Sequence, residues 1–303
     1  MNETVRAKGE SLSLAGIFPP IPTPFDESGD VDHDALCANL QRWHGYGLAG
    51  YVVLGSNGET ALLSVEEKQV ILQTARSTIP EDKLLIAGTG CESARQTIEL
   101  TDFAAQAGAD AALVLTPHFY GMKRANLVSY YGAVADASPI PVILYNVPKF
   151  THVDMDAATI AQIATHPNVI GIKDSGGNIT KIADTVRQTA DDYQVLAGSA
   201  GFLLASLVVG AVGGVVALAN AAPQQAIDIY GLHREGQWDR AAELQRRMVP
   251  VNAAITARFG VPGLKAALDM LGWVGGPVRL PLLDLSPEER RIVESILKAG
   301  AVL

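Results

Sequence analysis

One lysine, Lys173, ends a short apolar run of strand-forming residues, VIGIK at 169–173. An amine at the end of a buried strand loses water, and burial disfavours its charged form. A neutral amine can attack a carbonyl carbon and form a Schiff base, which withdraws electrons from the adjacent C–C bond. The same position also suits a structural lysine paired with Asp174 or Glu59, because ion-pair networks occur at such places too. Both interpretations stay open on position alone.

Two other segments carry polar groups that a keto acid would need. GSNGE at 55–59 has glycines on both sides of Ser56 and Asn57, so its backbone can turn tightly and direct N–H groups toward a carboxylate. Tyr145 ends the apolar run VILY, and its hydroxyl can donate and accept a proton. Each segment also has an ordinary explanation, a tight strand-to-helix turn for the first and a packing residue for the second.

These side chains need a scaffold that brings strand ends together. From residue 14 onward, short β-rich runs alternate with helical periodicity, which is typical of βα units around a parallel sheet. Eight such strands, each followed by a helix, predict a closed (β/α)8 TIM barrel with its active site at the carboxyl ends of the strands. An open doubly wound sheet is the alternative. The predicted strands are 16–25, 50–55, 83–90, 111–117, 141–148, 168–175, 193–199 and 213–220.

After residue 223 the strand signals stop. Helical patterns follow at 236–260, 261–272 and 286–300, without a low-complexity linker before them. We therefore predict a C-terminal helical extension packed on the barrel. The predicted division is an N-terminal arm at 1–13, the barrel at 14–236 and the extension at 237–303.

Composition excludes several classes of function. The net charge is −9 and the pI about 5.1, so the basic footprint that attracts nucleic acid or anionic membranes is missing. Two cysteines without CxxC spacing and six histidines without HExxH predict neither a disulfide framework nor a metal site. The chain shows no nucleotide-binding glycine motif, and we predict no cofactor. No secretory or membrane-spanning segment is evident, which predicts a cytoplasmic protein.

GSNGE, LYNVP and GIKDSGG, at the ends of the second, fifth and sixth predicted strands, resemble the motifs of one superfamily. It is that of dihydrodipicolinate synthase and N-acetylneuraminate lyase, the pyruvate-dependent class I aldolases, and the resemblance spans residues 14 to about 300. It implies that Lys173 forms an imine with pyruvate and that Tyr145 is the general acid/base. It also implies that Ser56 and Asn57 bind the carboxylate, with Ser56 in the proton relay.

This sequence differs from the superfamily's pattern at two positions. Superfamily members are tetramers of tight dimers, in which a tyrosine after the fourth strand reaches the neighbour's site. TPHFYGMK has Phe119 at that position and Tyr120 next to it, so Tyr120 is the candidate substitute in an expected homotetramer. Dihydrodipicolinate synthases carry an arginine after YNVP for the carboxylate of aspartate semialdehyde. This chain has Phe150 there, with Lys149 adjacent and expected to point elsewhere, which argues against that substrate.

Within the superfamily, segments such as GTGCESARQT, GAVGGVVALAN and VNAAITARFGVPGLK most resemble 4-hydroxy-2-oxoglutarate aldolase. That likeness implies substrate-binding positions at Ser175 and Val215 and a reversible, metal-free cleavage of 4-hydroxy-2-oxoglutarate to pyruvate and glyoxylate. More generally, the substrates are pyruvate and a small aldehyde or keto acid. One alternative is 4-hydroxy-tetrahydrodipicolinate synthase, which condenses pyruvate with aspartate semialdehyde. Another is a catalytically quiet keto-acid-binding barrel, suggested by the missing cross-subunit tyrosine.

Overall fold

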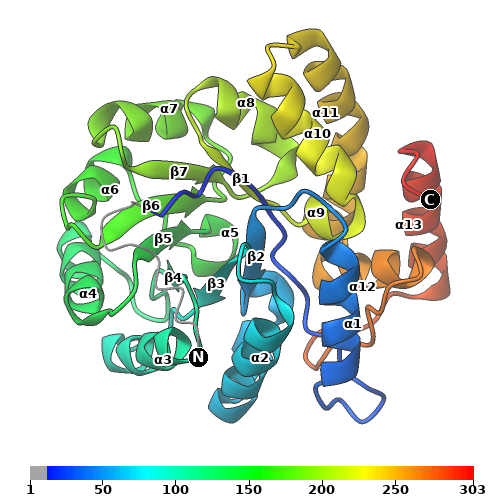
Figure 1. The fold of residues 1–303 in the computed structure, drawn as a ribbon, viewed down its shortest axis with the longest axis horizontal. Helices are drawn as coiled ribbons and strands as arrows, with labels where there is room; N and C mark the ends of the chain where they lie inside the picture. Colours follow the sequence, from blue (N-terminus) through cyan, green and yellow to red (C-terminus); the bar gives the residue numbers. More distant parts are fainter. Residues whose placement is uncertain (1–11) are drawn as a thin grey trace.

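The computed structural model of the protein describes residues 12–303 and has one eight-stranded parallel sheet at its centre (Figure 1). The strands follow the order β1-β8-β7-β6-β5-β4-β3-β2, so consecutive strands are neighbours and β1 also pairs with β8. Their bounds are β1 Gly16–Phe18, β2 Gly50–Val53, β3 Leu84–Gly88, β4 Ala111–Leu115, β5 Val142–Asn146, β6 Val169–Asp174, β7 Gln194–Ala197 and β8 Gly213–Val215.

The ring closes between β2 and the chain at and just after β1. The N–H of Ala49 donates to the carbonyl of Ile17 at 3.0 Å, and the N–H of Val52 donates to the carbonyl of Pro19 at 3.0 Å. The N–H of Ile21 returns a bond of 3.0 Å to the carbonyl of Val52. The predicted (β/α)8 barrel is therefore confirmed, and the open-sheet alternative is wrong.

All eight strands are shorter than predicted, the first and the eighth by more than half. The first ends at Phe18 instead of residue 25 because the prolines at 19, 20, 22 and 24 lack the N–H that a strand ladder needs. The eighth ends at Val215, and the helical turn α9 (Leu218–Ala221) follows it. Asn220 stabilises this turn, since its amide donates to the carbonyls of Pro20 at 3.0 Å and Ala217 at 3.1 Å.

Helices surround the strands on the outside of the ring (Figure 1). Five of them begin at an Asp, Ser or Asn whose side chain accepts the backbone N–H three residues on, the usual N-cap. The outer helices are α1 His33–Trp43, α2 Val65–Thr78, α3 Ala94–Gln106, α4 Arg124–Ala137, α6 Ala157–Ile163, α7 Ile179–Gln188, α8 Leu203–Val208 and α10 Pro223–Arg234. Short turns after strands are η1 Ser56–Gly58, η2 Thr60–Leu62, α5 Pro148–Thr151 and η3 Ala200–Phe202.

The C-terminal helices pack on α8, α9 and α10 of the barrel (Figure 1). They are α11 Trp238–Ala253, the π-helical η4 Ala254–Arg258, α12 Gly260–Met270 and α13 Pro287–Ala299. The segment after α12 packs on α1, where Trp273 stacks on Trp43 with ring centroids 5.0 Å apart. Asn39 of α1 exchanges two hydrogen bonds with Val274, of 2.7 and 3.0 Å. The domain boundaries stay predictions, and the predicted arm lies outside the described residues up to residue 11.

Alternate strand residues fill the inside of the barrel. These buried side chains form one cluster with Leu14, which comes just before β1. The cluster accounts for the all-apolar character of the strands, because both faces of a barrel strand are covered. Its members from the strands are Phe18, Val52, Leu84, Ile86, Ala111, Leu113, Ile143, Tyr145, Leu196 and Val215.

Candidate active site

Lys173 points into the barrel at the carboxyl end of β6. It is in register with Tyr145 on one neighbouring strand and with Leu196 on the other. Residues paired across parallel strands project to the same face, and both neighbours belong to the interior cluster. The Lys173 side chain is buried, with its residue only 3 % exposed, and its Nζ lies 4.1 Å from the centre of the Tyr145 ring.

The two carboxylates suggested as structural partners of Lys173 are committed to other lysines. Asp174 pairs with Lys181 at 2.9 Å, and Glu59 pairs with Lys265 at 2.6 Å. Across residues 12–303, the Nζ of Lys173 makes neither an ion pair nor a hydrogen bond. The structural-lysine interpretation is therefore wrong, and the amine is free to react.

A polar network centred on the buried Asn146 and Asp174 holds the ends of β5 and β6 together. The amide of Asn146 donates to Asp174 at 3.1 Å and to Asp154 at 2.9 Å, and its oxygen accepts the Met155 N–H at 3.0 Å. Lys181 forms ion pairs with both carboxylates. Asn146 and Asp174 directly follow the two inward-facing residues, so the network fixes where Tyr145 and Lys173 lie. The sequence analysis missed this network. A usable signal was that a polar residue directly follows the inward-facing residue at both strand ends, Asn146 after Tyr145 and Asp174 after Lys173.

The predicted turn brings Ser56 to Tyr145. The two hydroxyls share a hydrogen bond of 2.8 Å. Next to Ser56, the side-chain nitrogen of Asn57 is buried and finds no hydrogen-bond partner among the described residues. Buried polar atoms are rarely unpaired in folded proteins, which marks this amide as an unsatisfied donor next to Ser56. The structure thus places Ser56, Tyr145 and Lys173 as one group.

Ser175 directly follows β6 and Val215 ends β8, the two strands on either side of β7. The Ser175 hydroxyl donates to the carbonyl of Gly198 at 3.4 Å, so it is directed toward the end of β7. Val215, the last residue of β8, is buried in the same interior cluster as Tyr145. Their roles in substrate binding stay predictions.

Tyr120 lies apart from this group. With Phe119 it forms an edge-to-face pair 5.0 Å apart, and the two residues are 73 % and 76 % exposed. Glu92 holds the backbone of the loop that carries these two rings. Its carboxylate accepts hydrogen bonds from the N–H groups of His118 at 3.0 Å and Phe119 at 2.9 Å. Two exposed rings at this position are compatible with contact to a second subunit. A role for Tyr120 in a neighbour's site stays a prediction.

A cavity of about 550 Å³ opens beside Ser56 and Tyr145. Its other walls come from α5 and from the C-terminal residues 256–257, 259–262 and 281–282, which the sequence analysis did not identify as part of the site. Lys149 and Phe150 both line it, so the expectation that Lys149 points elsewhere is wrong. The Nζ of Lys149 donates to the carbonyl of Thr256 at 3.2 Å, which positions the ammonium at the cavity wall.

A closed (β/α)8 barrel whose carboxyl-terminal mouth holds a lysine without an ion pair among residues 12–303 is typical of the lysine-dependent, or class I, aldolases. Within that class the chain belongs to the dihydrodipicolinate synthetase family, whose model matches residues 13–300. The predicted superfamily is confirmed, and the protein is an enzyme.

Individual relatives agree with this assignment. The chain is 36 % identical over 283 residues to a 4-hydroxy-tetrahydrodipicolinate synthase from Methanothrix thermoacetophila, covering 93 % of this chain and 95 % of the relative. It resembles the crystal structure of a dihydrodipicolinate synthase from Acinetobacter baumannii complexed with pyruvate, with TM-score 0.92, 29 % identity and coverage of 96 % and 100 %. A prophage protein of the same family from E. coli K12, also in complex with pyruvate, gives TM-score 0.91 and 28 % identity, again with coverage of 96 % and 100 %.

These comparisons support a pyruvate-dependent aldolase of this family. They do not support the predicted special likeness to 4-hydroxy-2-oxoglutarate aldolase. In the described part of the chain, no helix has the length and apolar character needed to cross a membrane. The homotetramer and the cytoplasmic location stay predictions.

Proposed function

We propose that the protein condenses pyruvate with aspartate semialdehyde through a Schiff base on Lys173, as a 4-hydroxy-tetrahydrodipicolinate synthase. The observation that carries this proposal is the arrangement of three side chains. The unpaired amine of Lys173 lies 4.1 Å from the Tyr145 ring centre, and the Tyr145 hydroxyl is hydrogen-bonded to Ser56 at 2.8 Å. The choice of second substrate is supported by the names of the relatives.

In this mechanism the Nζ of Lys173 attacks the keto carbon of pyruvate. The oxygen of the resulting carbinolamine takes up a proton and leaves as water, so a C=N bond replaces the C=O bond. Loss of a proton from the methyl carbon gives an enamine, which attacks the aldehyde carbon and forms the new C–C bond. Tyr145 moves these protons with Ser56 as its relay, while Ser56 and Asn57 bind the pyruvate carboxylate. The amino group of the condensed semialdehyde then adds to the imine carbon, and the C–N bond to Lys173 breaks as Nζ takes up a proton, which releases the cyclic product and restores the amine.

Cleavage of 4-hydroxy-2-oxoglutarate to pyruvate and glyoxylate is a second candidate, favoured by one observation. Phe150 lines the cavity at the position where the resemblance places the synthases' arginine, and a phenyl ring in place of that guanidinium fits a shorter second substrate such as glyoxylate. In both reactions the second substrate carries a carboxylate. Lys149 supplies a cation for it at the cavity wall, because its hydrogen bond to Thr256 uses one of the three N–H donors of an ammonium.

A direct comparison of substrates tests the proposal. The purified enzyme should show a higher kcat/KM for pyruvate with aspartate semialdehyde than for glyoxylate release from 4-hydroxy-2-oxoglutarate. The reverse order would make the aldolase the main function. An imine with pyruvate that borohydride reduces and traps, without turnover of either substrate, would favour the catalytically quiet barrel.

Replacing Lys149 by Ala should raise KM for the carboxylated second substrate roughly tenfold or more, the scale of a lost hydrogen bond to a charged group. Capture of pyruvate at Lys173 should not change, because Lys149 serves the second substrate only. Lys149→Arg is the matched control and should keep most of the affinity. An unchanged KM in the alanine variant would exclude Lys149 from substrate binding.

A further inference from the structure

Glu59 is a buried carboxylate that the proposed chemistry does not use. It ends the GSNGE turn, and its side chain is 0 % exposed. Its φ is 54°, and Leu54 on the other side of the turn has φ 60°. Non-glycine residues rarely adopt this left-handed conformation, and they keep it only where surrounding contacts hold them. The turn that presents Ser56 and Asn57 is therefore strained at both ends and needs an anchor.

The C-terminal helices provide that anchor through Lys265 on α12. Its Nζ lies 2.6 Å from one oxygen of Glu59 and donates to the carbonyl of Pro277 at 2.7 Å. The backbone N–H of Arg279 donates to the other Glu59 oxygen at 2.9 Å. Burial lowers the pKa of Lys265, while the charge of Glu59 acts in the opposite direction. Removing either partner would leave an uncompensated buried charge.

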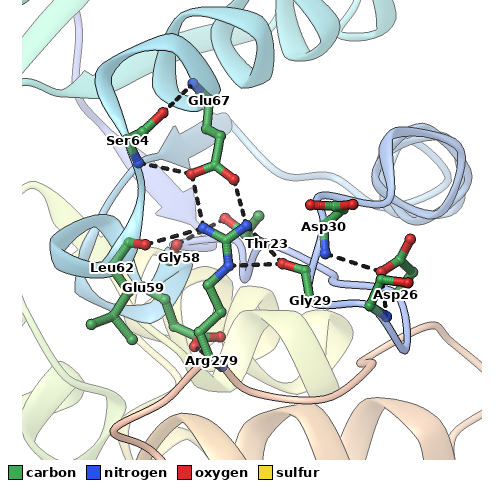
Figure 2. Close-up of polar contacts among 11 residues, drawn as sticks. Thr23, Asp26, Gly29, Asp30, Gly58, Glu59, Leu62, Ser64, Glu67 and Arg279 are labelled. Atoms are coloured by element: carbon green, nitrogen blue, oxygen red, sulfur yellow. Dashed lines mark hydrogen bonds and ion pairs between the residues drawn. The ribbon is translucent and has the colours of Figure 1, made fainter.

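Arg279 fixes the chain on the other side of Glu59 (Figure 2). Its guanidinium donates twice to the carbonyl of Gly29, at 2.9 and 2.7 Å, and once to the carbonyl of Leu62 at 3.1 Å. It also forms a two-pronged ion pair with Glu67 at the start of α2. All five N–H donors of the guanidinium are thus engaged. Residues 281–282, which follow Arg279 after Leu280, are part of the cavity wall.

Glu59 is joined directly to the catalytic group. Its backbone N–H donates to the carbonyl of Ser56 at 3.2 Å, and the hydroxyl of Ser56 contacts Tyr145 at 2.8 Å. Thr23 donates to the carbonyl of Gly58 at 2.8 Å and holds the middle of the same turn. A displacement of the Glu59 carboxylate would therefore move Ser56 relative to the substrate.

We propose that Lys265 and Arg279 are positioning residues for the reaction, acting through Glu59 on Ser56 and Asn57. By this inference, which rests on the proposed function, the C-terminal extension completes the active site as well as packing on the barrel. One buried carboxylate joins two walls of the cavity that are far apart in the chain.

The experiment compares Glu59→Gln with the double variant Glu59→Gln/Lys265→Met, which removes both buried charges and so keeps the fold. We expect KM for pyruvate to rise about tenfold or more in both, since small misplacements of binding groups have large kinetic effects. The melting temperature of the double variant should stay nearer to that of the wild type. Lys298→Met is the control, because its ion pair with Glu294 has the same 2.6 Å length but is exposed on α13.

The same double variant is then made in a Ser56→Ala background. If Glu59 acts through Ser56, the fold increase in KM for pyruvate caused by the double variant should be about fivefold or more smaller in the Ser56→Ala background, because the effects of coupled residues are not additive. Equal effects in both backgrounds, or an unchanged pyruvate KM, would overturn the inference and leave the proposed function intact. A wild-type enzyme that captures no pyruvate with borohydride would refute the proposed function itself.

Discussion

Lys173→Met should abolish the covalent capture of pyruvate. Incubation of the wild type with pyruvate and borohydride should add the mass of a reduced imine to the peptide containing Lys173, and the variant should show no addition. Methionine has nearly the same length and volume as lysine, so the barrel mouth stays filled. Lys181 and Lys265 are not expected to replace it, because both are held in ion pairs, and the Nζ of Lys149 is hydrogen-bonded to the carbonyl of Thr256.

The stability of this variant is the control. Because Lys173 has no ion pair within residues 12–303, Lys173→Met should retain the free energy of unfolding to within about 1 kcal/mol. Lys181→Met provides the contrast, since it breaks a buried pair with Asp174 and should cost about 3 kcal/mol. Mass addition to a different lysine in wild-type protein, or continued addition in Lys173→Met, would contradict the assignment of the Schiff base.

Tyr145→Phe should lower kcat by about 10²-fold or more, the scale of losing a positioned acid/base. The ring packs in the interior cluster, so phenylalanine keeps the fold and removes only the hydroxyl. Single-turnover measurement of imine formation and of product release separates the two proton-transfer stages. Both should slow, because the hydroxyl is proposed to move protons in each.

Ser56→Ala tests whether the hydroxyl pair works as a unit. Groups that act together are not additive, so the double variant Ser56→Ala/Tyr145→Phe should lose little more activity than Tyr145→Phe alone. Retention of the wild-type rate by Tyr145→Phe would refute its role as the acid/base. Fully additive losses would mean that the 2.8 Å hydrogen bond between the hydroxyls does not serve proton transfer.

Several features of the protein followed from the amino-acid sequence alone. The alternation of strand and helix patterns predicted the barrel, because the periodicities of strands and helices are local properties. Lys173, Tyr145 and Ser56 each come at the end of an apolar run. Their positions predicted that the three side chains lie together at one end of the barrel, since the carboxyl ends of parallel barrel strands meet there. Strand lengths were less well predicted, because proline-rich residues 19–24 and the α9 turn took the places of expected strand.

The partners of the charged residues were decided only by the tertiary structure. Asp174 and Glu59 were possible ion-pair partners of Lys173 in the sequence, because all three residues lie at or just after predicted strand ends. In the structure they pair with Lys181 on α7 and Lys265 on α12. Likewise, the cavity wall at 281–282 and the guanidinium of Arg279 come from a segment with no motif of its own. Sequence patterns report which face of an element is buried. Which distant element covers that face depends on how helices and strands pack in three dimensions, and this packing left the amine of Lys173 without an ionic partner among the described residues.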